Sequence, residues 1–70
     1  MTPREQDLYN YIVQFKQVNG YAPTVREMCT GINTNSLHHV SVMLEHLEDE
    51  GFIKCHKNKP RAIRVLKFIS

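Results

Sequence analysis

Apolar residues recur every three or four positions through about the first quarter of the chain, as on one face of an amphipathic helix. Thr2 and Glu5 have the spacing of a capping box, Pro3 suits the first helical position, and Gly20 is a typical helix stop. This pattern predicts a helix over residues 3–19. Its inward stripe would consist of Leu8, Tyr11, Ile12, Phe15 and Val18.

A second, shorter helix is predicted after the connector of residues 21–23. Thr24 and Glu27 repeat the capping-box spacing, and Gly31 is placed to end or bend the helix. We expect it to run from about Val25 to Thr30. Met28 and Cys29 are its inward-facing candidates.

The turn and cap residues Asn33-Thr34-Asn35-Ser36 introduce a third helix, predicted from about Leu37 to Glu50 and closed by Gly51. At about 100° per residue, its apolar side chains gather on one side of the helix. The expected inward stripe is Leu37, Val40, Leu44 and Leu47, with Met43 at its edge.

The remaining residues favour a β-hairpin. Residues 52–56 and 61–67 suggest strands, with Ile63 and Val65 on one face, and Lys57-Asn58-Lys59-Pro60 suggests the turn between them. Two strands are not stable alone, so they must lie against the helices. The predicted fold is therefore mainly α with a small β-hairpin, in one domain covering residues 1–70.

Charge is unevenly distributed, although the net value is only +2. Residues 1–53 carry three basic and seven acidic side chains, whereas residues 54–70 carry six basic ones and no acid. A concentrated positive segment on a near-neutral domain is typical of a protein that binds a polyanion. The alternative is a solvated basic tail.

Other function classes lack their usual signals. There is no long apolar run and no secretory leader, so we expect a cytoplasmic, nucleoid-associated protein without a membrane partner. Cys29 and Cys55 lack paired metal spacing, which predicts free thiols, at least one of them buried; Cys55-His56 gives only a weak zinc signal. No catalytic motif is present, and Glu5 and Glu27 are explained as capping residues. We expect no enzyme activity, cofactor, metal or small-molecule substrate.

The order of elements itself indicates a function. A short capped helix, a tight turn and a second amphipathic helix form a helix-turn-helix, whose second helix enters the DNA major groove. A basic hairpin after it has the place of a wing that contacts the phosphate backbone or the minor groove. The predicted architecture is a three-helix winged helix-turn-helix.

The segments GYAPTVREMCT (residues 20–30) and GFIKCHKNKPRAIRVL (residues 51–66) also resemble the N-terminal DNA-binding domain of the LexA repressor family. The resemblance covers nearly the whole chain in ungapped register and implies a winged helix-turn-helix that regulates transcription. The matching positions are Gly20, Pro23, Thr24, Arg26, Glu27, Ser36, Leu44, Leu47, Gly51, Ile53, Lys59, Pro60, Arg61, Ala62 and Ile63.

Two departures limit what the resemblance implies. Nothing in the chain corresponds to the self-cleaving serine-lysine peptidase domain of that family, so no autoproteolysis is expected. Where some members carry S-x-N-A-x-E-E, this chain has Ser36-Leu37-His38-His39-Val40-Ser41-Val42. We therefore expect a related but altered target, such as a phage or plasmid operator.

Candidate DNA contacts follow from the third helix and the basic segment. His38 and Val42 lie nearly opposite the expected stripe; histidine can hydrogen-bond base edges, and valine can contact a thymine methyl. The predicted base-reading residues are Asn35, Ser36, His38, His39, Ser41 and Val42. The predicted phosphate contacts are Thr24, Arg26, Lys54, Lys57, Lys59 and Arg61, with Arg64 and Lys67 as weaker candidates. Thr24 could instead only cap its helix, and Arg26 could pair with a carboxylate on the first helix.

These features predict a sequence-specific regulator of transcription. The favoured form is a repressor, which would occupy an operator and exclude polymerase. The alternative is a winged-helix module that binds another protein and modulates its action. A third interpretation is that the chain is the DNA-binding half of a longer repressor. Leu66 and Phe68 could help form a homodimer, or could instead cover the base of the first helix.

Overall fold

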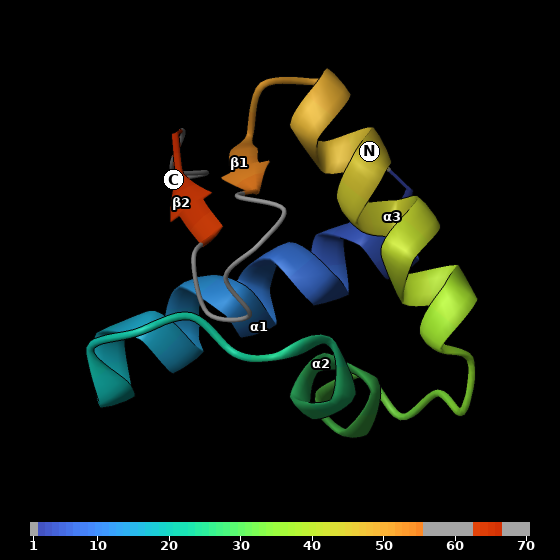
Figure 1. Cartoon of the computed structure of the whole chain (residues 1–70), viewed down its shortest axis with the longest axis horizontal. Helices are drawn as coiled ribbons and strands as arrows, with labels where there is room; N and C mark the ends of the chain where they lie inside the picture. The colour runs from blue at the N-terminus through green and yellow to red at the C-terminus, as the bar shows by residue number, and fades with distance from the viewer. Residues whose placement is uncertain (1, 56–62, 67–70) are drawn as a thin grey trace.

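The computed structural model describes residues 2–55 and 63–66, and its elements follow the predicted order (Figure 1). They are α1 (Pro3–Asn19), α2 (Val25–Gly31), α3 (Leu37–Asp49), β1 (Ile53–Cys55) and β2 (Ile63–Val65). The two strands are antiparallel, and β1 runs back beside α3 in the reverse direction (Figure 1). The predicted class, mainly helical with a small hairpin, is confirmed.

Hydrogen-bonding side chains at its ends set the limits of α1. Thr2 Oγ1 accepts from the Glu5 N–H at 3.2 Å, and the Thr2 N–H donates to the Glu5 carboxylate at 3.2 Å. At the other end Gly20 adopts a left-handed conformation with φ of 79°, and its N–H donates to the Lys16 carbonyl at 2.8 Å. A residue with a side chain would be strained there. Both predicted boundaries are confirmed.

The predicted capping box of α2 is present, and the helix ends one residue later than expected, at Gly31. The Thr24 N–H donates to the Glu27 carboxylate at 2.8 Å, and Thr24 Oγ1 accepts from the Glu27 N–H at 3.2 Å. A side chain at Gly31 would overlap the ring of Tyr11 on α1. Glycine at this position therefore allows α1 and α2 to approach each other closely.

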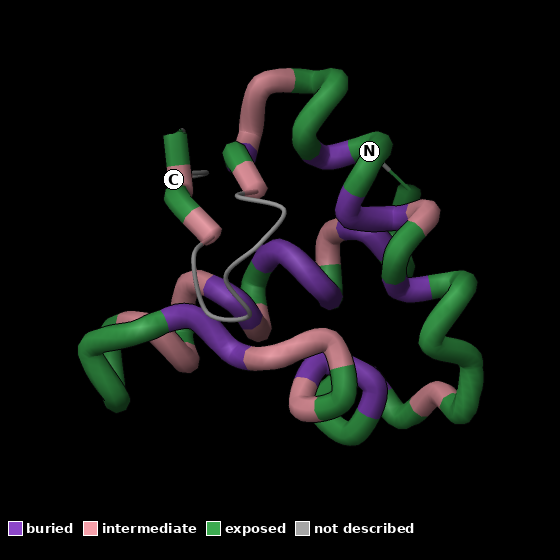
Figure 2. The backbone as a smooth tube through the Cα atoms, viewed as in Figure 1, coloured by how far each residue is buried: buried purple, intermediate pink, exposed green. Residues whose placement is uncertain are grey.

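The core lies where the three helices and the hairpin meet (Figure 2). Two predicted inward residues are exposed instead: Leu37 is 47% exposed and Val18 is 76% exposed. Leu37 lies in the first turn of α3 and Val18 in the last turn of α1. Conversely, Tyr9 is buried although the predicted stripe omitted it. The buried apolar residues of the helices and β1 are Leu8, Tyr9, Ile12, Met28, Cys29, Ile32, Val40, Met43, Leu44, Leu47 and Ile53.

Side chains from two helices hold the outer edges of the hairpin. On β1, the Cys55 N–H donates to the Glu48 carboxylate of α3 at 3.1 Å. On β2, the Lys16 ammonium of α1 donates to the Ile63 carbonyl at 3.1 Å. Both bonds satisfy backbone groups that a two-stranded sheet leaves unpaired at its edges. They also fix the hairpin relative to the helices.

The described strands are shorter than predicted, and their side chains lie on the predicted faces of the hairpin. Ile63 and Val65 are half-buried against the core. Lys54 lies opposite Arg64 in the strand register, and both side chains are exposed. The predicted turn of residues 57–60, together with His56, Arg61 and Lys67 at the predicted strand ends, lies outside the described residues.

The two cysteines are free thiols, as predicted. Cys29 is buried and Cys55 is half-buried, and burial raises the pKa of the Cys55 thiol. Within residues 2–55 and 63–66, no group of three or more histidine, cysteine or acidic side chains is placed to hold a metal ion. No helix in that part of the chain is long and apolar enough to cross a membrane.

An ion pair that the sequence did not suggest joins α1 to α3. Glu5 Oε2 lies 2.9 Å from His46 Nδ1, and the Glu5 side chain is only 6% exposed. The hydrogen bond that the Glu5 carboxylate accepts from the imidazole raises the pKa of His46 above its ordinary 6.5, and the same bond lowers the pKa of Glu5 below its ordinary 4.5. Glu5 thus caps its own helix and also binds a residue 41 positions away.

We expect this pair to make folding stability depend on pH. The raised pKa of His46 adds stability below about pH 6.5 that is lost as the pH rises through the folded-state value. The lowered pKa of Glu5 adds stability above about pH 4.5 that is lost on further acidification. The free energy of unfolding should therefore rise when the pH is lowered from 8 to 6. In His46→Gln this rise should shrink, as measured by urea unfolding.

His38→Gln is the matched control, because His38 is an exposed histidine on the same helix. When the pH is lowered from 8 to 6, the free energy of unfolding of this variant should rise about as much as that of the wild-type protein. An unchanged rise in His46→Gln would show that the pair does not stabilise the fold.

Candidate nucleic-acid interface

A tight turn orients the first residues of α3. Asn33 adopts a left-handed backbone conformation with φ of 59°, which reverses the chain after α2. The Thr34 N–H donates to the Cys29 carbonyl at 2.9 Å, and the Ser36 N–H donates to Thr34 Oγ1 at 3.3 Å. These bonds fix α3 relative to α2, as a helix-turn-helix requires.

Ser36 is the N-cap of α3, as predicted. Its hydroxyl oxygen accepts from the His39 N–H at 3.0 Å, which satisfies one of the free N–H groups at the start of the helix. The buried Cys29 thiol lies 3.8 Å from the Ser36 carbonyl. The turn is thus bonded to α2 on one side and to α3 on the other.

The first turns of α3 are exposed, as the site prediction requires (Figure 2). The half-buried member of the predicted set is Val42, so this valine presents only part of its surface. Leu37 joins the exposed group, although the helical pattern had placed it in the core. The exposed predicted base-reading residues are Asn35, Ser36, His38, His39 and Ser41.

Two contacts define the sides of α3. At about 100° per residue, Glu48 lies on the same side of the helix as Leu37 and Ser41, and Glu48 binds β1. By the same projection His46, which binds α1, lies on the same side as His39. The hairpin therefore meets α3 at Glu48, on the side that carries Leu37 and Ser41 nearer the start of the helix, and α1 meets it at His46, on the side that carries His39; His38 lies between these two sides.

Charge divides α3 along its length. Its first turn contains no acidic residue, whereas Glu45, Glu48, Asp49 and Glu50 gather at its far end. Acidic side chains near a helix C-terminus oppose the macrodipole and would repel a polyanion. The front of the helix alone is suited to lie against phosphates.

The predicted basic contacts fall in three places. Arg26 is exposed near the start of α2, and its alternative pairing with a carboxylate of α1 stays a prediction. Lys54 is exposed on the outer face of β1, with Arg64 opposite it. Like charges directly opposite each other destabilise a strand pair unless an anion lies between them or nearby. The predicted wing contacts Lys57, Lys59 and Arg61 lie outside the described residues.

Thr24 is already engaged within its capping box. Besides the two backbone bonds, its hydroxyl donates to the Glu27 carboxylate at 3.1 Å. Capping, the simpler interpretation of this residue, is what the structure shows. To contact a phosphate, Thr24 would have to give up one of these hydrogen bonds to Glu27.

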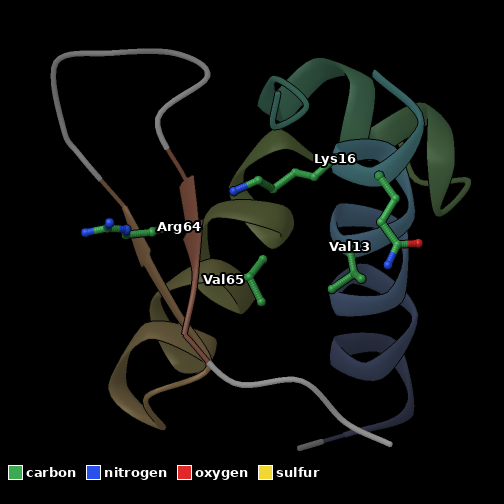
Figure 3. Close-up of a pocket in the computed structure, with 5 residues that line it drawn as sticks. Val13, Lys16, Arg64 and Val65 are labelled. Carbon is green, nitrogen blue, oxygen red and sulfur yellow. The ribbon is translucent and has the colours of Figure 1, made fainter. Parts of the chain in front are cut away.

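A cleft of about 360 Å³ lies between α1 and β2, and its lining residues belong to these two elements (Figure 3). Lys16 extends across it toward the hairpin, Val13 and Val65 face each other, and Arg64 points away from α1 (Figure 3). Its lining contains no histidine, cysteine or carboxylate among the described residues: it consists of Val13, Lys16, Gln17, Arg64 and Val65. These side chains do not form a catalytic or metal-binding set.

Comparison with known proteins agrees with this geometry. A sequence model of the family described as the LexA DNA binding domain matches residues 1–62. LexA repressors of Staphylococcus aureus strains Mu3, N315 and USA300 are each 39% identical over 66 residues. The match covers 94% of this chain and 32% of each repressor, so the chain spans about a third of the length of these relatives.

Proposed function

This chain belongs to the LexA DNA binding domain family, and we propose that it binds specific double-stranded DNA sites and represses transcription there. The relatives it matches are named as repressors, and the matched part is their DNA-binding region. Repression would follow from occupying an operator and excluding polymerase. No catalytic step is required of the chain in this role.

The observation that carries the proposal is the exposed, acid-free front of α3. We propose that it enters the major groove with Asn35, Ser36, His38, His39, Ser41 and Val42 toward the bases. Imidazole and amide groups can donate to or accept from base edges, and the exposed part of Val42 can contact a thymine methyl. Since this set differs from the S-x-N-A-x-E-E pattern of some family members, we expect a different operator.

Phosphate contacts would come from two sides of this helix. Arg26 is exposed near the start of α2, the first helix of the helix-turn-helix. Lys54 lies on the hairpin, which meets α3 at Glu48, on the side of the helix that carries Leu37 and Ser41. We propose that both bind phosphates, together with Lys57, Lys59 and Arg61 of the wing, and that Thr24 assists. A duplex lying between the start of α2 and the hairpin would then meet the front of α3.

Selection of binding sites from a random DNA pool tests the proposal directly. The wild-type protein should enrich one consensus sequence. The double variant His38→Ala plus Val42→Ala should bind that consensus at least about fivefold more weakly, because each base contact contributes about 1–3 kcal/mol.

The competing function is a module that binds another protein. Such a module would enrich no consensus, and its weak DNA binding would not change in the double variant. Gln17→Ala, an exposed change on α1, is the control for nonspecific effects.

The salt dependence of affinity tests the phosphate contacts. Each phosphate neutralised by a side chain contributes about 0.9 to the log–log slope of affinity against salt. Arg26→Ala and Lys54→Ala should each reduce the slope by about that amount and weaken binding to all sequences alike. Arg4→Ala is the matched control. Arg4 is an exposed basic residue of α1 and is adjacent to Glu5, which contacts the half of α3 that lies outside the proposed interface. An unchanged slope in Lys54→Ala would remove this residue from the interface.

We propose a homodimer as well, with Leu66 at the contact. Leu66 is 52% exposed, which leaves apolar surface for such a contact, while Phe68 lies outside the described residues. Paired half-sites one helical turn apart would then match two recognition helices. Sedimentation equilibrium should show a dimer that Leu66→Asp weakens. A monomer throughout the concentration range would contradict this arrangement.

A further inference from the structure

Leu37 has no role in the core, although its spacing fits the apolar stripe of α3. It is 47% exposed, whereas the inward side of the helix is completed by Val40, Met43, Leu44 and Leu47. It is also not required as a cap, because Ser36 supplies that bond. A single exposed leucine is common on protein surfaces. The position of this one, at the first residue of α3, gives it a specific use.

The side of α3 on which Leu37 lies is fixed by a contact three turns further along. Glu48 is 11 residues after Leu37, which returns the helix to within about 20° of the same side. Glu48 binds the Cys55 N–H, so this side faces the hairpin. Ser41 lies on the same side, one turn after Leu37. Leu37 and Ser41 therefore share the side of α3 on which the hairpin is attached further along, the side on which we expect the duplex to meet both elements.

We propose that Leu37 is a specificity-determining residue that packs against the 5-methyl group of a thymine. Thymine is the base that presents a methyl group in the major groove, and apolar side chains are its natural partners. His38, the next residue, would bind the polar edge of the same or the adjacent base pair. This inference rests on the proposed function, because it requires the front of α3 to lie in the groove.

The test uses the consensus selected by the wild-type protein. Each thymine of that consensus is replaced in turn by deoxyuridine, which removes the methyl group and leaves the hydrogen-bonding edge unchanged. At one position the wild-type protein should lose about fourfold in affinity, the equivalent of burying one methyl group. Leu37→Ala should bind the unmodified site more weakly by at least this factor and should be insensitive to deoxyuridine at that position.

Val18→Ala is the matched control, since Val18 is another exposed apolar residue and lies at the end of α1. It should retain the full fourfold response to deoxyuridine. Alanine favours the helix at position 37, so the variant should fold, and circular dichroism verifies this.

The outcomes separate the two proposals. If the wild-type protein enriches no consensus, the proposed function fails and this inference fails with it. If a consensus is found and deoxyuridine has the same effect on the wild-type protein and on Leu37→Ala at every thymine, the inference alone is overturned. Leu37→Ala could also bind all sites more weakly by the same factor while its response to deoxyuridine stays like that of the wild-type protein. That result would place Leu37 against the sugar-phosphate backbone and would also overturn the inference.

Discussion

The rotation of α3 about its own axis is the constraint on which the rest of the structure depends. Burial of its apolar residues holds the helix on the core, but the hydrophobic effect is non-directional and tolerates small rotations. Two directional contacts define the angle: His46 binds Glu5 of α1, and Glu48 binds the backbone of β1. Both lie in the second half of the helix, so the outer face of the first half stays exposed while its orientation is set.

This arrangement separates the attachment of α3 to the rest of the fold from the DNA recognition that we propose for its front. The far end carries the acidic residues and the contacts to α1 and the hairpin, whereas the front carries polar and histidine side chains without an acid. The hairpin in turn is held at both edges, by Glu48 and by Lys16. In a domain of 70 residues the apolar core is small, and such bonds contribute to positional accuracy more than to total stability. A rigid front on a fixed helix is what base recognition requires.

Local chemistry predicted the helix limits well, because capping boxes and the Gly20 stop depend only on neighbouring residues. The helical pattern also predicted most of the core. It failed at Leu37 and Val18, since a projection gives the angle of a side chain and not how far the neighbouring elements extend. The pair Glu5–His46 could not be predicted, because capping already explained Glu5 and the two residues are 41 positions apart. The candidate contacts of the recognition helix were recognisable from element order and from the family resemblance, while their binding to DNA stays a prediction.

The central claim is that the front of α3 and the hairpin meet one duplex together. Nuclear magnetic resonance of the ¹⁵N-labelled protein, titrated with its selected DNA, measures this residue by residue. The account predicts that the largest amide shift changes fall on residues 35–42 of α3 and on residues 53–55 and 63–66 of the hairpin, at one common stoichiometry. Changes concentrated on α1 and the cleft beside β2, with the front of α3 unaffected, would contradict it.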